Sequence, residues 1–187
     1  TLTEMVIPTG APIPAQQTTD IAVEFNLDAR AEVAATAVPP TPYTTYGTSV
    51  NAFDSQGVPI PVQLYFVKTA TDAWDIYTDD PATTASLASI TFDTAGKVQG
   101  AVDALPITIT SANTNIGPFT ATLDVSKATQ YGTAFAISNL TQDGYTAGNL
   151  TGVAISKAGV ITTRYSNGQS QARGQLALAD FRNVQGL

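Results

Sequence analysis

Apolar and polar residues alternate along most of this chain, in short runs separated by turn-forming residues. The clearest run is DIAVEFNLDA, residues 20–29, where Ile21, Val23, Phe25 and Leu27 fall on the same side of an extended chain. A period of two is typical of a β-strand with one buried face. Further runs of this kind occupy residues 48–53, 58–68, 73–80, 88–92, 105–110 and 119–125. We therefore predict an all-β protein.

The residues between these runs predict tight turns, and hence antiparallel hairpins. Two turns have the form Asp-x-x-Gly, at residues 54–57 and 93–96. The Asp side chain caps the turn backbone, and Gly adopts the left-handed conformation that the turn requires. A third hairpin is expected to turn at residues 157–159, and a fourth at Asn167-Gly168. An Asn-Gly pair favours a two-residue turn in which both residues have positive φ.

Two stretches lack the alternation. Residues 6–19 are rich in proline, which has no backbone donor for a sheet, so they are predicted to form an extended connector or an edge segment. Residues 31–47 are rich in Ala, Pro and Thr and are predicted to be a loop.

The composition says more about the possible functions of the chain than about its fold. The 187 residues are 43% apolar and only 12% charged, which predicts one domain or two small ones with a buried core. The chain has no Cys and no His, which excludes thiol nucleophiles, disulfides, imidazole ligands and Ser-His-Asp catalysis. We predict that the protein is not an enzyme, with no catalytic residue, no cofactor and no metal ligand.

Charge bears on the partners and on the domain organisation. The net charge of −7 argues against binding to nucleic acid or to anionic membranes, and no apolar run approaches the length of a membrane span. Residues 1–144 hold 14 acidic and 4 basic residues, whereas residues 145–187 hold 1 and 4. A step from −10 to +3 is typical of a boundary between two structural units, although chance clustering in a short tail gives the same count.

Four acidic residues near the single tryptophan are a possible cation site. Carboxylates suit a hard cation such as Ca²⁺, but the spacing of an EF-hand is absent. We favour solvated edge charges that deter strand pairing, and nothing in the pattern shows the carboxylate pair of a glycosidase. The acidic residues are Asp72, Asp75, Asp79 and Asp80.

The aromatic residues of the same region suggest a second possible site. Trp74, Tyr65, Phe66 and Tyr77 would suit a sugar-stacking platform, but alternation places Tyr65 and Phe66 on opposite faces. We favour a core position for Trp74. Asn139 and Asn149 each begin an Asn-x-Thr sequence, which we interpret as turn asparagines. The residues alone leave open a binding module or an assembly subunit.

Two longer blocks carry a resemblance. Residues 49–80 contain a strand, a D-S-x-G turn, a strand ending in YFVK and a W-x-x-Y strand. Residues 142–187 contain D-G-Y-x-x-G-x-L, a YSNG hairpin and a G-Q-x-x-L-A-x-F-x-N-x-x-G-L close. In this order, together with FNLDA at residues 25–29, the blocks resemble the bacterial flagellar hook protein. Residues 100–135 match weakly, and the last block resembles flagellar rod proteins more loosely.

The resemblance implies an architecture. An outer β-barrel or sandwich-like domain, residues 13–144, would be inserted into a smaller inner β domain formed by residues 1–12 and 145–187. Both would be hairpin-rich and antiparallel.

The resemblance also implies a function. The intact protein would polymerise into the extracellular hook, a flexible curved tube that acts as a universal joint and transmits motor torque to the filament. Its partners would be copies of itself and the rod, hook-cap and hook–filament junction proteins. Residues 1–20 lack the features of a signal peptide, which leaves open a removed signal peptide or another export route, and the resemblance implies export without a cleaved one.

One departure from the family pattern shapes the expectation for this chain. Hook subunits have helices with apolar heptads at both ends, and no such heptads occur here. We therefore expect a fragment without the polymerising ends, monomeric by itself. The alternatives are an extracellular carbohydrate-binding or adhesin module and a distal rod subunit.

Overall fold

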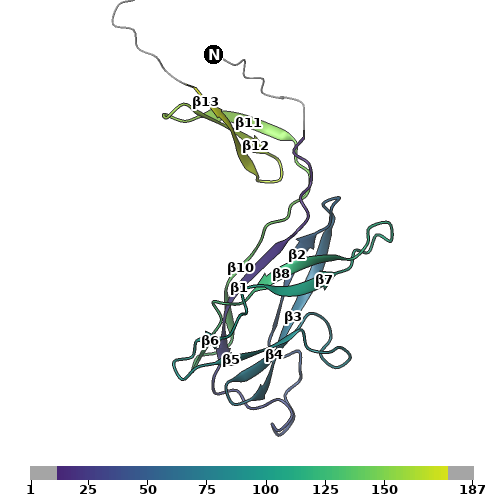
Figure 1. The fold of residues 1–187 in the computed structure, drawn as a ribbon, viewed down its shortest axis with the longest axis vertical. Helices are drawn as coiled ribbons and strands as arrows, with labels where there is room; N and C mark the ends of the chain where they lie inside the picture. Colours follow the sequence, from purple (N-terminus) through teal and green to yellow (C-terminus); the bar gives the residue numbers. More distant parts are fainter. Residues whose placement is uncertain (1–11, 177–187) are drawn as a thin grey trace, which may run out of the picture. The chain divides into compact units, whose positions relative to one another are not determined.

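The computed structural model describes residues 12–176, which form parts of two compact units (Figure 1). The large unit is Gln16–Tyr145, and the described part of the small unit comprises residues 12–15 and 146–176. All regular secondary-structure elements in residues 12–176 are β-strands, which confirms the predicted all-β class. No helix in this range is long and apolar enough to cross a membrane.

The first sheet of the large unit is built around β1 (Asp20–Asp28), the strand with the clearest alternation. β1 pairs antiparallel with one neighbour, β10, and parallel with β8 and β9. The antiparallel prediction therefore holds with these two exceptions. The other strands of this sheet are β10 (Ala136–Gln142), β8 (Phe119–Asp124), β7 (Leu105–Ile109) and β9 (Thr129–Tyr131).

The second sheet of the large unit is an antiparallel meander in chain order. Short turns connect most of its strands, whereas the longer segment 78–87 connects the third strand to the fourth, and neighbours in sequence are neighbours in space. Its strands are β2 (Gly47–Phe53), β3 (Pro59–Ala70), β4 (Ala73–Tyr77), β5 (Ala88–Phe92) and β6 (Val98–Gln99).

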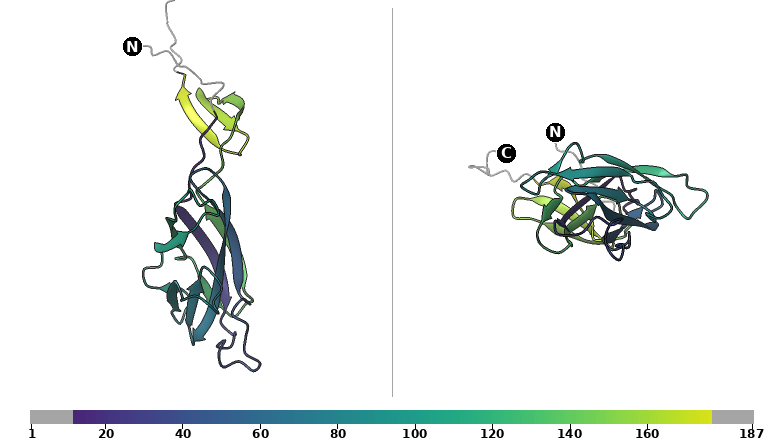
Figure 2. Two further views of the ribbon diagram at one scale, coloured as in Figure 1. Left: turned by 90° about the vertical axis from the view of Figure 1, so that its right-hand side faces the viewer. Right: turned by 90° about the horizontal axis from the view of Figure 1, so that it is seen from below.

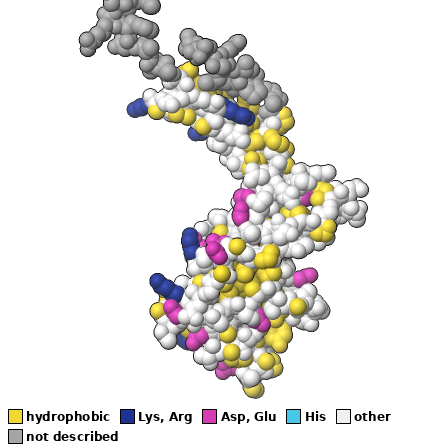
Figure 3. Space-filling view, viewed as in Figure 1, with side chains coloured by type: hydrophobic (Ala, Val, Ile, Leu, Met, Phe, Trp, Pro, Cys, Tyr) yellow, Lys and Arg dark blue, Asp and Glu magenta, His cyan; other side chains and the backbone are white. Residues whose placement is uncertain are grey.

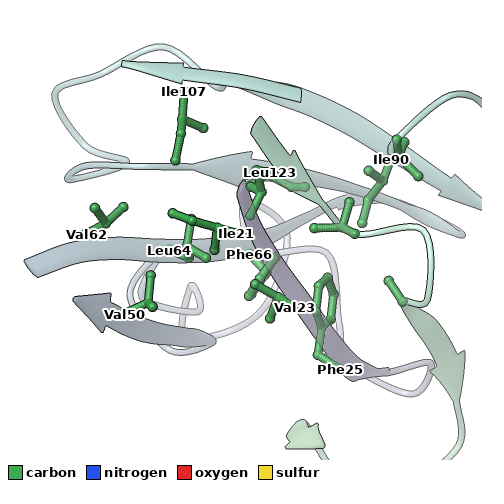
Figure 4. Close-up of a cluster of buried hydrophobic side chains, with 14 of the residues drawn as sticks. Ile21, Val23, Phe25, Val50, Val62, Leu64, Phe66, Ile90, Ile107 and Leu123 are labelled. Atoms are coloured by element: carbon green, nitrogen blue, oxygen red, sulfur yellow. The ribbon is translucent and has the colours of Figure 1, made fainter. Parts of the chain in front are cut away.

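The two sheets face each other across one hydrophobic core, as in a sandwich. Side chains from β1 and β3 point into the space between the sheets (Figure 4). The rings of Phe25 and Phe66 lie 4.3 Å apart between their centroids and join the two sheets directly. The predicted buried face of β1 is confirmed, because Ile21, Val23 and Leu27 are all buried.

The small unit contains a three-stranded antiparallel sheet (Figure 2). Its strands are β11 (Leu150–Ile155), β12 (Val160–Tyr165) and β13 (Ser170–Gln175). Ile161, Thr163 and Tyr165 alternate along β12 and are buried. Ile13 pairs with Gly148, so part of the proline-rich connector also belongs to this unit. Residues 16–19 of the connector belong to the large unit, whereas its residues 6–11 and the closing segment from Phe181 lie outside the described residues.

Four hairpins turn in the same way. In each, the fourth turn residue is a glycine with φ between 75° and 82°, and its N–H donates to the carbonyl of the first. The predicted Asp-x-x-Gly turns are confirmed: Asp54 Oδ1 accepts from Gln56 and Val58, and Asp93 Oδ1 accepts equivalent bonds. The four glycines are Gly57, Gly96, Gly159 and Gly168.

The predicted geometry of the Asn-Gly turn is wrong. Gly168 has φ of 82°, but Asn167 is not in the left-handed region. The turn runs over Tyr165–Gly168, closed by Gly168 N–H donating to Tyr165 O at 3.1 Å. The loop is thus longer than the expected two residues, because the side chain of Asn167 has partners of its own that hold it in the third turn position.

Two strands have no counterpart in the predictions. β9 is very short, and β10 follows a weak pattern of mostly exposed or half-buried residues. Asn139 lies within β10, so its interpretation as a turn residue is wrong. Asn149 directly precedes β11, in the connector. Pairing with β1 selects β10 as a strand, a tertiary effect that short-range alternation does not register.

Candidate functional surfaces

The four aspartates of the acidic stretch do not form one site. Asp72 has φ of 57° in the β3–β4 turn, where its side chain accepts a hydrogen bond from Gln130. Asp75 accepts from Ser89 across the β4–β5 pair. Asp80 caps the following turn through Ala82 N–H at 2.9 Å. Within residues 12–176, no group of three or more acidic side chains is arranged to hold a metal ion.

Trp74 is a core residue, as the sequence suggested. Its side chain is completely buried, and the ring of Tyr46 meets it edge-on at 5.4 Å between centroids. Trp74 Nε1–H donates to Gln130 Oε1 at 2.6 Å, and Gln130 in turn donates to Asp72. A buried indole cannot stack on a sugar, so the carbohydrate platform loses its central residue.

Lys68 is a buried polar residue that sequence reasoning missed. Its Nζ donates to the carbonyls of Ala29 and Ala31, both at 2.8 Å, and lies 5.7 Å from the centre of the Trp74 ring. Burial lowers the pKa of Lys68, although Asp72 and Asp28 act in the opposite direction. The amine therefore fastens the start of the loop 31–46 to β3.

This Pro-rich loop, residues 31–46, carries the most exposed large apolar residue of the large unit. It is the long connection between β1 and β2 (Figure 1). Val38 is 93% exposed and Tyr43 is 42% exposed. A shallow groove of about 430 Å³ runs along the loop, lined by Ala34, Ala35, Pro40, Thr41, Pro42 and Tyr43. Such a surface suits contact with another protein better than recognition of a charged ligand.

A cleft of about 190 Å³ lies in the large unit between β3 and β7. Its apolar residues come from both sheets, and Asp79 is its one charged residue. It contains no pair of acidic or basic groups that would transfer protons to a substrate. The lining residues are Ile60, Pro61, Val62, Thr78, Asp79, Ile107, Thr108, Ile109 and Thr110.

The buried polar groups of the large unit serve the fold. Asp54 is fully buried and accepts from Ser111 Oγ at 3.0 Å in addition to its turn bonds. Thr18, also fully buried, donates to Gln142 and accepts from Phe53 N–H. In the described part of the chain, every buried side-chain nitrogen or oxygen has a hydrogen-bond partner. No unsatisfied group there points to a missing ligand.

Uncharged atoms dominate the surface that Figure 3 shows, with Lys, Arg, Asp and Glu side chains scattered between them. The ion pairs of the described residues lie at the surface and join Arg30 to Asp28 and Lys127 to Glu24. In the small unit, Arg173 donates to Tyr165 Oη at 2.7 Å. Hydrogen bonds from Thr163 and Arg173 lower the pKa of Tyr165. The fold and these surfaces define a β-sandwich protein whose polar side chains support structure.

Comparison with known proteins identifies the family. A family model described as "Flagellar basal body protein FlaE D2 domain" matches residues 26–145, most of the large unit. The chain therefore belongs to the flagellar hook protein family.

Relatives from several bacteria agree with this assignment. The flagellar hook protein FlgE of Escherichia coli K12 is 36% identical over 144 residues, covering 74% of this chain and 36% of the relative. FlgE of Treponema pallidum is 34% identical over 236 residues, covering 98% of this chain and 50% of the relative. The chain thus spans about a third to a half of the length of these relatives.

A solved structure shows the same fold. The crystal structure of Helicobacter pylori flagellar hook protein FlgE2 matches with a TM-score of 0.53 and 21% identity. The match covers 75% of this chain and 34% of that chain. At this identity the similarity bears on the fold.

Proposed function

We propose that this chain provides the two β units of a flagellar hook subunit, a structural protein that polymerises into a flexible curved tube and transmits motor torque to the filament. The observation that carries the proposal is the family match over residues 26–145, which lies within the large unit. The similarity to the FlgE relatives supports the same role.

The large unit would be the outer domain of the subunit and the small unit part of the inner domain. The chain crosses from the small unit to the large one at Ala15–Gln16 and returns at Tyr145–Thr146. This layout is that of an inserted domain. The change from an acidic to a basic segment near residue 145 supports the same division.

The function would be mechanical and not enzymatic. The buried polar residues Lys68, Asp54 and Gln130 all make hydrogen bonds that hold the fold together. A weakly charged surface suits a bending tube, because neighbouring subunits can slide over uncharged groups without breaking fixed ion pairs. The loop 31–46 is the part of the large unit best suited to such a contact.

The partners would be other copies of the intact subunit in the tube, and the rod, hook-cap and hook–filament junction proteins at its ends. The site of action would be outside the cell. Residues 1–187 by themselves should be monomeric, because they contain no apolar heptad segment to drive assembly. Analytical ultracentrifugation of this chain tests that expectation.

Deletion of the gene in its source organism tests the function. We expect cells without hooks in electron micrographs and without swimming motility, both restored by the wild-type gene. Restoration by a Val38→Ala variant but not by Val38→Asp would implicate the loop 31–46 in subunit contacts. Hooks of normal length in the deletion strain would refute the proposal. Binding of purified protein to specific sugars on a glycan array would instead favour the adhesin alternative.

A further inference from the structure

The pair Asn167-Gly168 has a chemical reactivity that its role as a hairpin turn does not use. When Gly follows Asn, its backbone nitrogen can attack the side-chain carbonyl carbon, because no Cβ obstructs the approach. The attack closes a five-membered succinimide ring and expels ammonia. The reaction requires the Asn side chain to swing toward the following nitrogen, and that nitrogen to lose its proton.

The fold engages every group that this reaction needs. Asn167 Nδ2 donates to the carbonyl of Thr146 at 2.7 Å, and Asn167 Oδ1 accepts from Gln169 N–H at 3.1 Å. The attacking nitrogen, that of Gly168, donates its proton to the carbonyl of Tyr165 at 3.1 Å. Ring closure therefore requires three hydrogen bonds to open together.

Packing adds a steric lock on the same side chain. Asn167 lies against Gly148, where an added Cβ would stand 2.6 Å from Asn167 Cγ and 2.7 Å from its Oδ1. Gly148 is fixed in turn by two backbone hydrogen bonds with Ile13, at 2.8 and 3.1 Å. The Asn167 amide thus occupies space that is free only because residue 148 is a glycine. All of these residues belong to the small unit.

We propose that Asn167 is a deamidation site that reacts in the unfolded chain and that folding of the small unit protects from the reaction. In the unfolded chain, the Gly168 nitrogen forms a bond to Asn167 Cγ, the Cγ–Nδ2 bond breaks, and the displaced nitrogen leaves as ammonia. One water molecule then opens the ring at either carbonyl and leaves aspartate or isoaspartate. The inference rests on the geometry of this turn and does not depend on the proposed function.

Deamidation would disrupt the same contacts of Asn167 that protect it in the folded chain. In aspartate, an oxygen replaces Nδ2, so a carboxylate oxygen would face the carbonyl of Thr146 with no proton between them. In isoaspartate, the backbone gains a methylene within a tight turn, where Gly168 N–H donates to Tyr165 O and Tyr165 N–H donates to Gln169 O. Either product would weaken the attachment of the β12–β13 hairpin to the connector before β11.

The test compares deamidation of the whole chain in buffer and in concentrated urea at the same mildly alkaline pH. Peptide mapping by mass spectrometry would follow Asn167, and circular dichroism would report folding in each sample. We expect loss of the amide to be about tenfold or more slower in buffer, because reaction then requires a local opening of the small unit. Equal rates in the two solvents, with the chain folded in buffer, would overturn the proposal.

A Gly148→Ala variant separates the local lock from global folding. The added methyl group would displace the Asn167 side chain and break its bond to Thr146. We expect Asn167 to react faster than in the wild type in buffer, and at the wild-type rate in urea. A folded variant with unchanged reactivity would refute the lock. If the small unit of the variant is unfolded, its rate in buffer must approach the rate in urea, and a slow rate would overturn the proposal.

Discussion

Trp74 shows how one residue can connect several parts of the large unit. Trp74 lies on β4, and its ring packs against the ring of Tyr46 and close to the amine of Lys68. Its Nε1–H donates a hydrogen bond to Gln130 on β9. Gln130 in turn reaches the β3–β4 turn through Asp72. A single fully buried side chain thus combines apolar packing with hydrogen bonds that run from β4 through β9 to the β3–β4 turn.

Replacing this side chain should be costly. We expect Trp74→Ala to lower the free energy of unfolding of the large unit by about 3–5 kcal/mol, because it leaves a cavity and removes the donor to Gln130. Urea unfolding followed by circular dichroism measures the change. Val38→Ala, at an exposed position, should change stability by less than about 0.5 kcal/mol. A loss below about 1 kcal/mol for Trp74→Ala would contradict the assigned core position.

Asp54 gives the stability of the large unit a defined pH dependence. Burial tends to raise its pKa, but hydrogen bonds from Val58, Ser111, Gln56 and Gly57 outweigh burial and hold the pKa below its ordinary value of 3.8. A lowered pKa in the folded state means that the ionised carboxylate stabilises the fold. That contribution is complete well above pH 3.8 and is lost as the pH falls through the lowered folded pKa.

We expect the free energy of unfolding to decrease below about pH 4, where Asp54 begins to take up a proton on unfolding. An Asp54→Asn variant should be less stable at neutral pH and should show a shallower decrease on acidification. Urea unfolding at a series of pH values compares the two proteins. Parallel curves for variant and wild type would show that Asp54 does not carry this dependence.

At the scale of elements, the hairpins explain why the sheets adopt their register. Each Asp-x-x-Gly turn fixes which residues face each other, and a slip by one residue would move every core side chain to the solvent face. Ser156 and Tyr165 take the position of the aspartates in the small unit, and Gly159 and Gly168 take the left-handed position. The same turn is thus used in both units with different side chains at its start.

Two glycines offer a matched test of this point. Gly96 and Gly100 both have positive φ, 75° and 92°. A Cβ at Gly96 would stand 2.4 Å from the carbonyl oxygen of Gln130, whereas a Cβ at Gly100 would meet nothing within 4 Å. We expect Gly100→Ala to cost about 1–2 kcal/mol from the strained conformation, and Gly96→Ala clearly more. Thermal unfolding of both variants checks the order, and equal costs would contradict it.

At the scale of the whole molecule, the two units differ in the size of their cores. The large unit contains the 20 buried residues of the main hydrophobic cluster. In the described part of the small unit, the buried apolar residues are Ile13, Ile161 and Tyr165. Stability follows buried apolar area, so the large unit should be the more stable.

We expect the large unit, residues 16–145, to fold by itself when expressed without its flanks. Its unfolding midpoint in urea should match that of the second of two transitions in the full chain, with the small unit unfolding first. Urea unfolding of both proteins, followed by circular dichroism, makes the comparison. A single cooperative transition in the full chain, together with an unfolded large unit in isolation, would show that the two units depend on each other.

Much of the fold was predictable because its signals are local. The period of two identified β1 and the meander β2–β5, and turn chemistry located the hairpins between them. The pairing of β10 and β9 with β1 was not predictable, since it joins residues more than 100 positions apart in the sequence. Lys68 and Gln130 were missed for the same reason, because their partners lie on other elements.

The sequence by itself determined the all-β class, the Asp-x-x-Gly turns, the buried face of β1 and the resemblance to the hook family. These follow from neighbouring residues, whose backbone preferences and spacing are readable without contacts. Only the tertiary structure decided that β1 lies parallel to β8, that Trp74 is bonded to Gln130, and that Asn167 is fixed against Gly148. These depend on which distant segments meet, and that is settled by the packing of the whole core.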